Sequence, residues 1–247
     1  ASLWGANAVN GVINIITKSA HQTQGYLVTT QVGRNQERAI TEMQYGGEMG
    51  KGGHYRVYSK YYKHDGLVNI QGQKQQDDWN LKRGGFRLDW NASDRDALTV
   101  QGDAYTGVAK QLVFISMPAA TLVNNRIDLN GLNLLGRWKR NLADGDGDII
   151  LQTYYDLTSR DEISYGDWRS TFDLDFQHRW QRHDRQEWIW GLGIRRTNDD
   201  LTNSATLTYT PPQRQDILVS AFVQGEFKLF KQLRLTLGSK FEHNDYS

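Results

Sequence analysis

The chain has 247 residues, of which 38% are hydrophobic and 11% aromatic, and its 29 basic and 28 acidic residues give a formal net charge of +1. This balance gives no support for nucleic-acid binding through a basic surface, and the absence of cysteine excludes a disulfide framework and a cysteine-ligated zinc site. No apolar run approaches the roughly 18 residues that a membrane-spanning helix needs, so a chain that crosses a membrane must do so as a barrel.

The first 20 residues, ASLWGANAVNGVINIITKSA, combine turn chemistry with a β-rich run. Asn10-Gly11 favours a turn, and the run from Val12 to Thr17 favours a strand. Asn14 interrupts the apolar run, so its amide needs polar surroundings if the strand is buried. The segment has neither an initiator methionine nor the pattern of a signal peptide, and we therefore expect a processed chain or a fragment.

From residue 24 onward, polar and apolar residues alternate in segments separated by turn residues, which predicts strands. In the segment 172–180, for example, Phe172 and Leu174 fall on one face while Asp173 and Asp175 fall on the other. The pattern predicts eleven strands, at 24–33, 37–48, 53–64, 78–91, 97–107, 129–141, 148–160, 169–181, 186–197, 215–228 and 232–243.

The connections between these strands alternate in length. Short turns follow the second, fourth, sixth, eighth and tenth strands, and longer loops follow the third, fifth, seventh and ninth, at 65–77, 108–128, 161–168 and 198–214. Only the first hairpin, at 34–36, departs from the rule. This asymmetry is typical of bacterial outer-membrane barrels, whereas a soluble β-sandwich, the alternative for a chain with one wet face, gives no reason for it. Single-chain bacterial barrels close with an even strand number, so further strands are expected.

Candidate ligand residues fall in two groups. Arginine and lysine side chains predicted to face the lumen suit an anionic chelate, although the walls of a water-filled lumen also need charges, paired here with Asp89, Asp173 and Asp175. The predicted loop 108–128 is the longest and is apolar for an outside loop. The candidates are Arg56, Arg83 and Arg87, with Lys60, Arg137 and Arg179, from the lumen, and Phe114, Met117 and Arg126 from the loop.

Other patterns carry no chemistry. Asp144, Asp146 and Asp148 alternate like the start of a calcium loop, but Ile149 and Tyr155 stand where that loop requires glycine and glutamate. The 6 histidines show no metal-ligand spacing, and no nucleophile elbow, phosphate loop or dinucleotide fingerprint occurs. We expect no metal, no cofactor and no enzymatic activity, with an outer-membrane barrel enzyme kept as an alternative.

The opening segment, with a barrel behind it, resembles the end of the plug domain of TonB-dependent outer-membrane receptors, which commonly reads small-aromatic-Gly-x-Asn-Ala-x-x-Gly-Val-Ile-Asn-Ile. The match is long and specific, and the barrel strands resemble the family by pattern alone. The matching residues are Leu3, Trp4, Gly5, Asn7, Ala8, Gly11, Val12, Ile13, Asn14 and Ile15.

The resemblance implies an all-β chain: the last strands of a plug domain at 1–20, then the N-terminal half of an antiparallel transmembrane β-barrel at 21–247, about 11 of about 22 strands. It also implies a receptor in the bacterial outer membrane that takes up a scarce nutrient, most often a ferric siderophore, otherwise heme, cobalamin, another metal chelate or a sugar. The expected partners are outer-membrane lipid, the ligand and the TonB energy-coupling complex, whose contact box has no counterpart in this chain.

Overall fold

The computed structural model describes residues 15–33, 37–115, 120–142, 146–182 and 185–245. A short 3₁₀ helix, η1 (Ala20–Thr23), precedes eleven strands. The strands are β1 (Gly25–Val32), β2 (Glu37–Glu48), β3 (Gly53–His64), β4 (Trp79–Asn91), β5 (Asp96–Ile115), β6 (Thr121–Asn141), β7 (Gly147–Asp161), β8 (Gly166–Arg182), β9 (Gln186–Thr202), β10 (Gln213–Phe230) and β11 (Leu233–Asn244).

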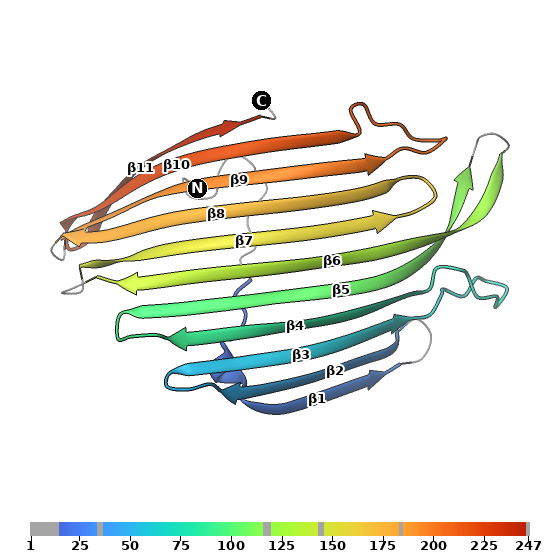
Figure 1. Cartoon of the computed structure of the whole chain (residues 1–247), viewed down its shortest axis with the longest axis horizontal. Helices are drawn as coiled ribbons and strands as arrows, with labels where there is room; N and C mark the ends of the chain where they lie inside the picture. The colour runs from blue at the N-terminus through green and yellow to red at the C-terminus, as the bar shows by residue number, and fades with distance from the viewer. Residues whose placement is uncertain (1–14, 34–36, 116–119, 143–145, 183–184, 246–247) are drawn as a thin grey trace.

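All eleven strands belong to one antiparallel sheet in which sequence order is also spatial order. Figure 1 shows this sheet as a single layer, with the short turns at one end of the strands and the longer loops at the other. The predicted antiparallel all-β architecture is confirmed, and the sandwich alternative is wrong because the described strands form one sheet, not two. In the part of the chain that the structure describes, β1 and β11 are the two edges of this sheet.

The two faces of the sheet differ in polarity, as two adjacent rows of side chains across the strands show. One row runs Trp138, Leu151, Phe176, Leu192, Ala221 and Phe241 across β6 to β11. The adjacent row, on the opposite face, runs Arg137, Gln152, Asp175, Gly193, Ser220 and Glu242. Because side chains alternate along a strand, this register gives one apolar face and one polar face.

The segment before β1 lies against the polar face. Arg56 and Arg87 donate hydrogen bonds to Lys18 and Thr17, and these arginines belong to the polar rows of β3 and β4. We therefore refer to the polar face as the inner face and to the apolar face as the outer face. If the sheet closes into a barrel, the segment before β1 lies within it.

The sheet has almost no conventional core. Among the described residues, Ala20 and Ile127 are the only buried apolar residues, and no large side chain is fully buried. Outer-face residues such as Leu192 and Phe241 are 54% and 68% exposed. A single layer with this much exposed apolar surface needs an apolar environment on one side. No helix in the described ranges is long and apolar enough to span a membrane.

The strand boundaries differ from prediction mainly around β5 and β6. The predicted loop 108–128 is wrong, because β5 continues to Ile115 and β6 begins at Thr121, with Lys110 to Ile115 paired to Arg126 to Thr121. The consecutive apolar residues Leu112 to Ile115, which are unusual for a loop on the outside, belong to strand β5. Figure 1 shows the long hairpin curving away from the neighbouring strands at the loop end of the sheet.

Candidate functional site

The inner-face arginines are engaged within the chain. Arg83 forms an ion pair with Asp103 at 3.0 Å, and Arg87 forms one with Asp89 at 2.7 Å. The Arg56 guanidinium donates to the backbone oxygen of Lys18 at 3.2 Å. These contacts favour the alternative in which the charges stabilise the wall of the lumen, with part of the wall holding the preceding segment.

Asp89 is the centre of the attachment between that segment and the wall. Its carboxylate accepts hydrogen bonds from the backbone N–H of Ala20 at 2.7 Å, from the Thr99 hydroxyl at 2.8 Å and from two nitrogens of Arg87 at 2.7 and 2.9 Å. Arg87 also donates to the Thr17 hydroxyl at 3.0 Å. The Asp89 carboxylate thus joins residues 17–20 to β4 and β5, and Arg56 joins them to β3.

A second inner-face cluster combines rings and a cation near the loop end of β3 and β4. The His64 and Trp79 rings stack at 5.4 Å with an interplanar angle of 9°, and the Tyr62 ring lies 6.4 Å from Trp79. The Lys60 ammonium lies 5.1 Å from the centre of the Tyr62 ring. The sequence gives no signal for this cluster, because residues 65–78 separate the two strands and only the register of His64 with Trp79 brings the rings together.

The residues predicted from loop 108–128 lie in the β5–β6 hairpin. Phe114 is on β5 and 63% exposed, and Arg126 is on β6 and paired to Asp128 at 2.8 Å. By register, both belong to the outer face, so the structure does not bring them together with Arg56, Arg83 and Arg87. Met117 lies outside the described residues.

The β7–β8 connection holds one side of this hairpin. The Glu162 side chain, only 4% exposed, accepts hydrogen bonds from Asn125 at 2.9 Å, from Gln111 at 3.2 Å and from Arg160 at 2.9 Å. The Asn125 side chain in turn accepts from the backbone N–H of Ile163 at 3.1 Å. A buried carboxylate with three donors therefore joins the β5–β6 hairpin to β7 and the β7–β8 connection.

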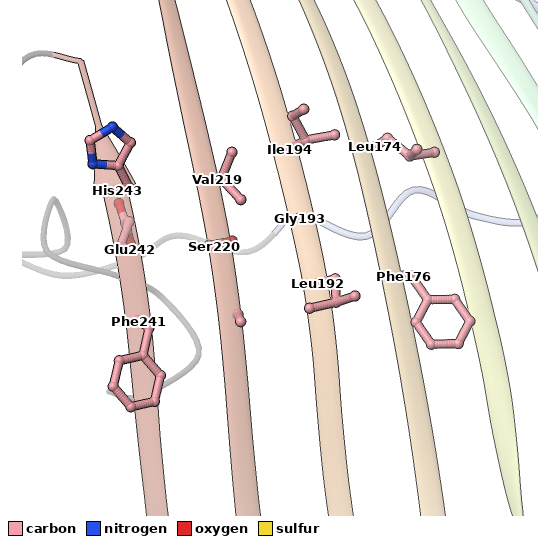
Figure 2. Close-up of a pocket in the computed structure, with 11 residues that line it drawn as sticks. Leu174, Phe176, Leu192, Gly193, Ile194, Val219, Ser220, Phe241, Glu242 and His243 are labelled. Carbon is pink, nitrogen blue, oxygen red and sulfur yellow. The ribbon is translucent and has the colours of Figure 1, made fainter.

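An apolar depression lies on the outer face of β8 to β11 (Figure 2). It has a volume of about 590 Å³, and Phe176, Leu192, Ile194, Val219 and Phe241 surround it in the figure. Its walls are side chains of the continuous apolar face, so it fits contact with lipid rather than recognition of a polar nutrient.

Several predicted residues have limited or no structural description. Ile15, the last residue of the plug-like motif, is 82% exposed, and the other motif residues lie outside the described ranges. Asp144 also lies outside them, whereas Asp148 pairs with Arg179 and Lys139. In the described part of the chain, no group of three or more histidine, aspartate or glutamate side chains is placed to hold a metal ion.

Comparison with solved structures identifies the architecture. The chain is similar to the siderophore receptor PirA from Pseudomonas aeruginosa, with 15% identity and a TM-score of 0.71 over 99% of this chain and 42% of that one. Its TM-score with the ferripyoverdine receptor of the outer membrane of Pseudomonas aeruginosa is 0.63, at 12% identity over 92% and 38% of the two chains. The chain is also similar to the copper transporter OprC, with a TM-score of 0.66 and 13% identity over 89% of this chain and 36% of that one.

The sheet has the fold of part of the barrel of these receptors. This likeness in fold agrees with the resemblance to TonB-dependent receptors stated from the sequence. The chain spans less than half the length of the receptors compared. These structures are receptors and a transporter, not enzymes. No family model matches the chain, and no curated protein matches it either.

Proposed function

We propose that the chain is the end of the plug domain and the first half of the barrel of a TonB-dependent outer-membrane receptor that takes up a ferric siderophore or another metal chelate. The observation that carries the proposal is the combination of a two-faced eleven-stranded sheet with a TM-score of 0.71 to a siderophore receptor over 99% of the chain. The plug would end near residue 20, where η1 begins, and the barrel wall would follow.

The chemistry of the two faces supports placement in a membrane. The outer rows expose leucine, phenylalanine and valine side chains, which lipid tails would cover, while the inner rows present charges and amides to a water-filled lumen. The edges of β1 and β11 leave backbone groups that need partners, and about 11 further strands would supply them in a barrel of the plugged size class.

The inner-face ring cluster supports a ligand with aromatic and anionic groups. Trp79 and Tyr62 offer ring faces, and Lys60 offers a cation beside them. A ferric chelate built from aromatic or acidic oxygen donors has both features. Lys60 also pairs with Glu42, at 3.1 Å, but it lies against the Tyr62 ring, whereas Arg83 and Arg87 pair with acidic neighbours outside the ring cluster. We therefore assign these two arginines to the wall rather than to the ligand.

Energy coupling follows from the same arrangement. A plug inside the lumen blocks diffusion, so passage of a ligand requires the plug to move, and no nucleotide is available in the outer membrane to drive that movement. Force must therefore come through TonB acting on the plug. The contacts of Arg56, Arg87 and Asp89 would hold the junction between plug and wall during this movement.

Uptake in cells tests the proposal. Deleting the gene should abolish accumulation of radioactive iron supplied as a chelate to iron-starved cells, and deleting TonB should have the same effect. The complete receptor should fractionate with outer membranes and require detergent for extraction. Recovery of the receptor in the soluble fraction would refute the membrane placement. Normal uptake of iron, copper, cobalamin and sugars in the deletion strain would refute the transport function.

A further inference from the structure

The last residues of β5, 111–115, have a free edge beside the β3–β4 loop. β5 pairs with β4 only as far as Ala109, but with β6 as far as Ile115. In the described ranges, no strand pairs with the β4 side of residues 111–115. On the other side of the same hairpin, β6 pairs with β7 only from Asp128 onward, and the Asn125 side chain accepts a hydrogen bond from the Ile163 N–H. Proteins commonly cover exposed strand edges, so the uncovered edge calls for a partner.

The chain already begins to cover this edge. Immediately before β4, the backbone oxygen of Asp78 accepts a hydrogen bond from the Lys110 N–H at 3.0 Å, and the Asp78 carboxylate pairs with the Lys110 ammonium at 3.2 Å. This contact continues the register of Trp79 with Ala109 by one residue. Extending the register further would place residues 77, 76, 75, 74 and 73 opposite residues 111, 112, 113, 114 and 115.

In the structure, residues 73–77 instead fold back on their own loop. Gln75 donates to the Leu67 oxygen at 2.7 Å, Val68 bridges to Lys74, and the Asp77 carboxylate accepts from the Leu67 N–H at 2.8 Å. Gly72 has φ of 78°, a value that favours glycine, and it makes the tight turn. The segment therefore forms a small hairpin, and pairing with β5 ends at the contact of Asp78 with Lys110, one residue before the free edge begins at Gln111.

We propose that residues 73–77 can leave this small hairpin and add to the free edge of β5, so that β4 would begin at Gln73 instead of Trp79. The exchange replaces the few backbone hydrogen bonds of the small hairpin with those of a strand pair. The two arrangements are thus close enough in hydrogen bonding to form a two-state element. Residues 65–72 reach far enough, since eight extended residues span about 26 Å and five strand residues advance about 17 Å.

The side chains fit the extended arrangement. By alternation, Lys74 and Gln76 would lie on the outer face beside Phe114 and Leu112, which are 63% and 53% exposed in the structure. The methylene groups of lysine and glutamine would cover these apolar side chains while the polar ends stay in water. Gln73, Gln75 and Asp77 would face inward with Gln111.

The movement would act as a lid at the mouth of the lumen. The loop that moves joins β3 to β4, so it starts and ends at His64 and Trp79 of the inner-face ring cluster. It also releases Lys74 from Asp65, 3.5 Å away in the structure. Only the link to ligand entry rests on the proposed function; the strand addition itself does not.

Engineered disulfides distinguish the two arrangements, because the chain has no cysteine. Gln75→Cys with Val113→Cys would meet only in the extended arrangement, at a non-hydrogen-bonded pair whose Cα atoms would be about 4.5 Å apart, within disulfide range. Val68→Cys with Lys74→Cys would meet only in the small hairpin. Each pair is introduced into the complete receptor, oxidised mildly without ligand, and followed by unreduced gel mobility and peptide mass spectrometry.

We expect the small-hairpin pair to form quickly and the Gln75–Val113 pair to form more slowly but to completion. Adding Asp77→Ala, which removes the hydrogen bond to Leu67, should accelerate the second disulfide by about tenfold. The proposal is overturned if that disulfide does not form while the small-hairpin pair does, or if Asp77→Ala leaves its rate unchanged. Because neither ligand nor uptake is measured, these results stand apart from the test of transport.

Discussion

Replacing Asp89 with alanine should detach residues 17–20 from the barrel wall. The N–H of Ala20, a residue with 0% exposure, would lose its acceptor, and Arg87 would lose its carboxylate partner. An orphaned buried amide costs about 2 kcal/mol, which corresponds to about a thirtyfold rise in local opening. The lost ion pair adds to this, although Arg87 keeps Gln101 as a hydrogen-bond acceptor at 3.0 Å.

Amide hydrogen exchange at Ala20 in the complete receptor measures this opening directly. Thr99→Val is the matched control, because it removes one neutral hydrogen bond to Asp89 but leaves the Ala20 contact in place. Exchange at Ala20 should rise at least tenfold more in Asp89→Ala than in Thr99→Val. Equal exchange in the two variants would refute the view that Asp89 holds the segment. Asp89→Asn should fall between them, because an amide oxygen still accepts from Ala20.

Three further predictions concern the sheet and its connections. Gly131→Val should lower the midpoint of thermal unfolding, because a Cβ at position 131 would lie 2.5 Å from the Tyr105 ring carbon Cζ. Gly136→Ala should leave the midpoint unchanged, because the nearest atom to its Cβ would be 3.5 Å away. Equal midpoints for the two variants would contradict this prediction. Glu162→Ala should speed amide exchange at Ile163 about tenfold, because Asn125, which accepts from the Ile163 N–H, would lose its own acceptor. Glu162→Gln should have a smaller effect, because the glutamine oxygen can still accept from Asn125. Unchanged exchange in both variants would contradict the role of Glu162 in holding the hairpin. At the first residue of β5, next to the short turn that precedes this strand, hydrogen bonds from Ser93 and Trp138 lower the pKa of Asp96. Its stabilising contribution is therefore present above the ordinary pKa of about 3.9 and is lost as pH falls through the lower folded value. The emission of Trp138 should therefore hold steady from pH 7 to about pH 5 and change only in more acidic solution, and a change already at pH 6 would contradict the assignment.

The sequence predicted strands well where alternation and turn residues agreed. β2 and β3 have their predicted bounds, because glycine-rich turns and alternating side chains mark both. β5 and β6 are longer than predicted, since the strands are predicted from alternation and the run from Leu112 to Ile115 does not alternate. A segment can be a strand wherever a partner strand is available. In the hairpin, β5 and β6 are each other's partner beyond the point where β4 ends, so both strands continue there.

Sites were harder to predict than strands, because alternation gives the face of a residue but not its partner. The inward direction of Arg83 and Arg87 could be predicted, but their pairing with Asp103 and Asp89 depends on register and rotamer. The attachment of Ala20 could not be predicted at all, because a backbone N–H has no sequence signal. Glu162 gave no signal either, because its buried position arises only when three strands and a connection meet.

The contacts that join residues 17–20 to the wall also determine which substitutions the segment tolerates. Asp89 and Arg56 bind backbone atoms of Ala20 and Lys18, so the identity of the side chain at position 18 is largely free. Position 20 must stay small because the residue is fully enclosed, and position 17 benefits from a hydroxyl. The specificity of the junction therefore resides in the wall, and one such wall can accept segments of diverging sequence during evolution.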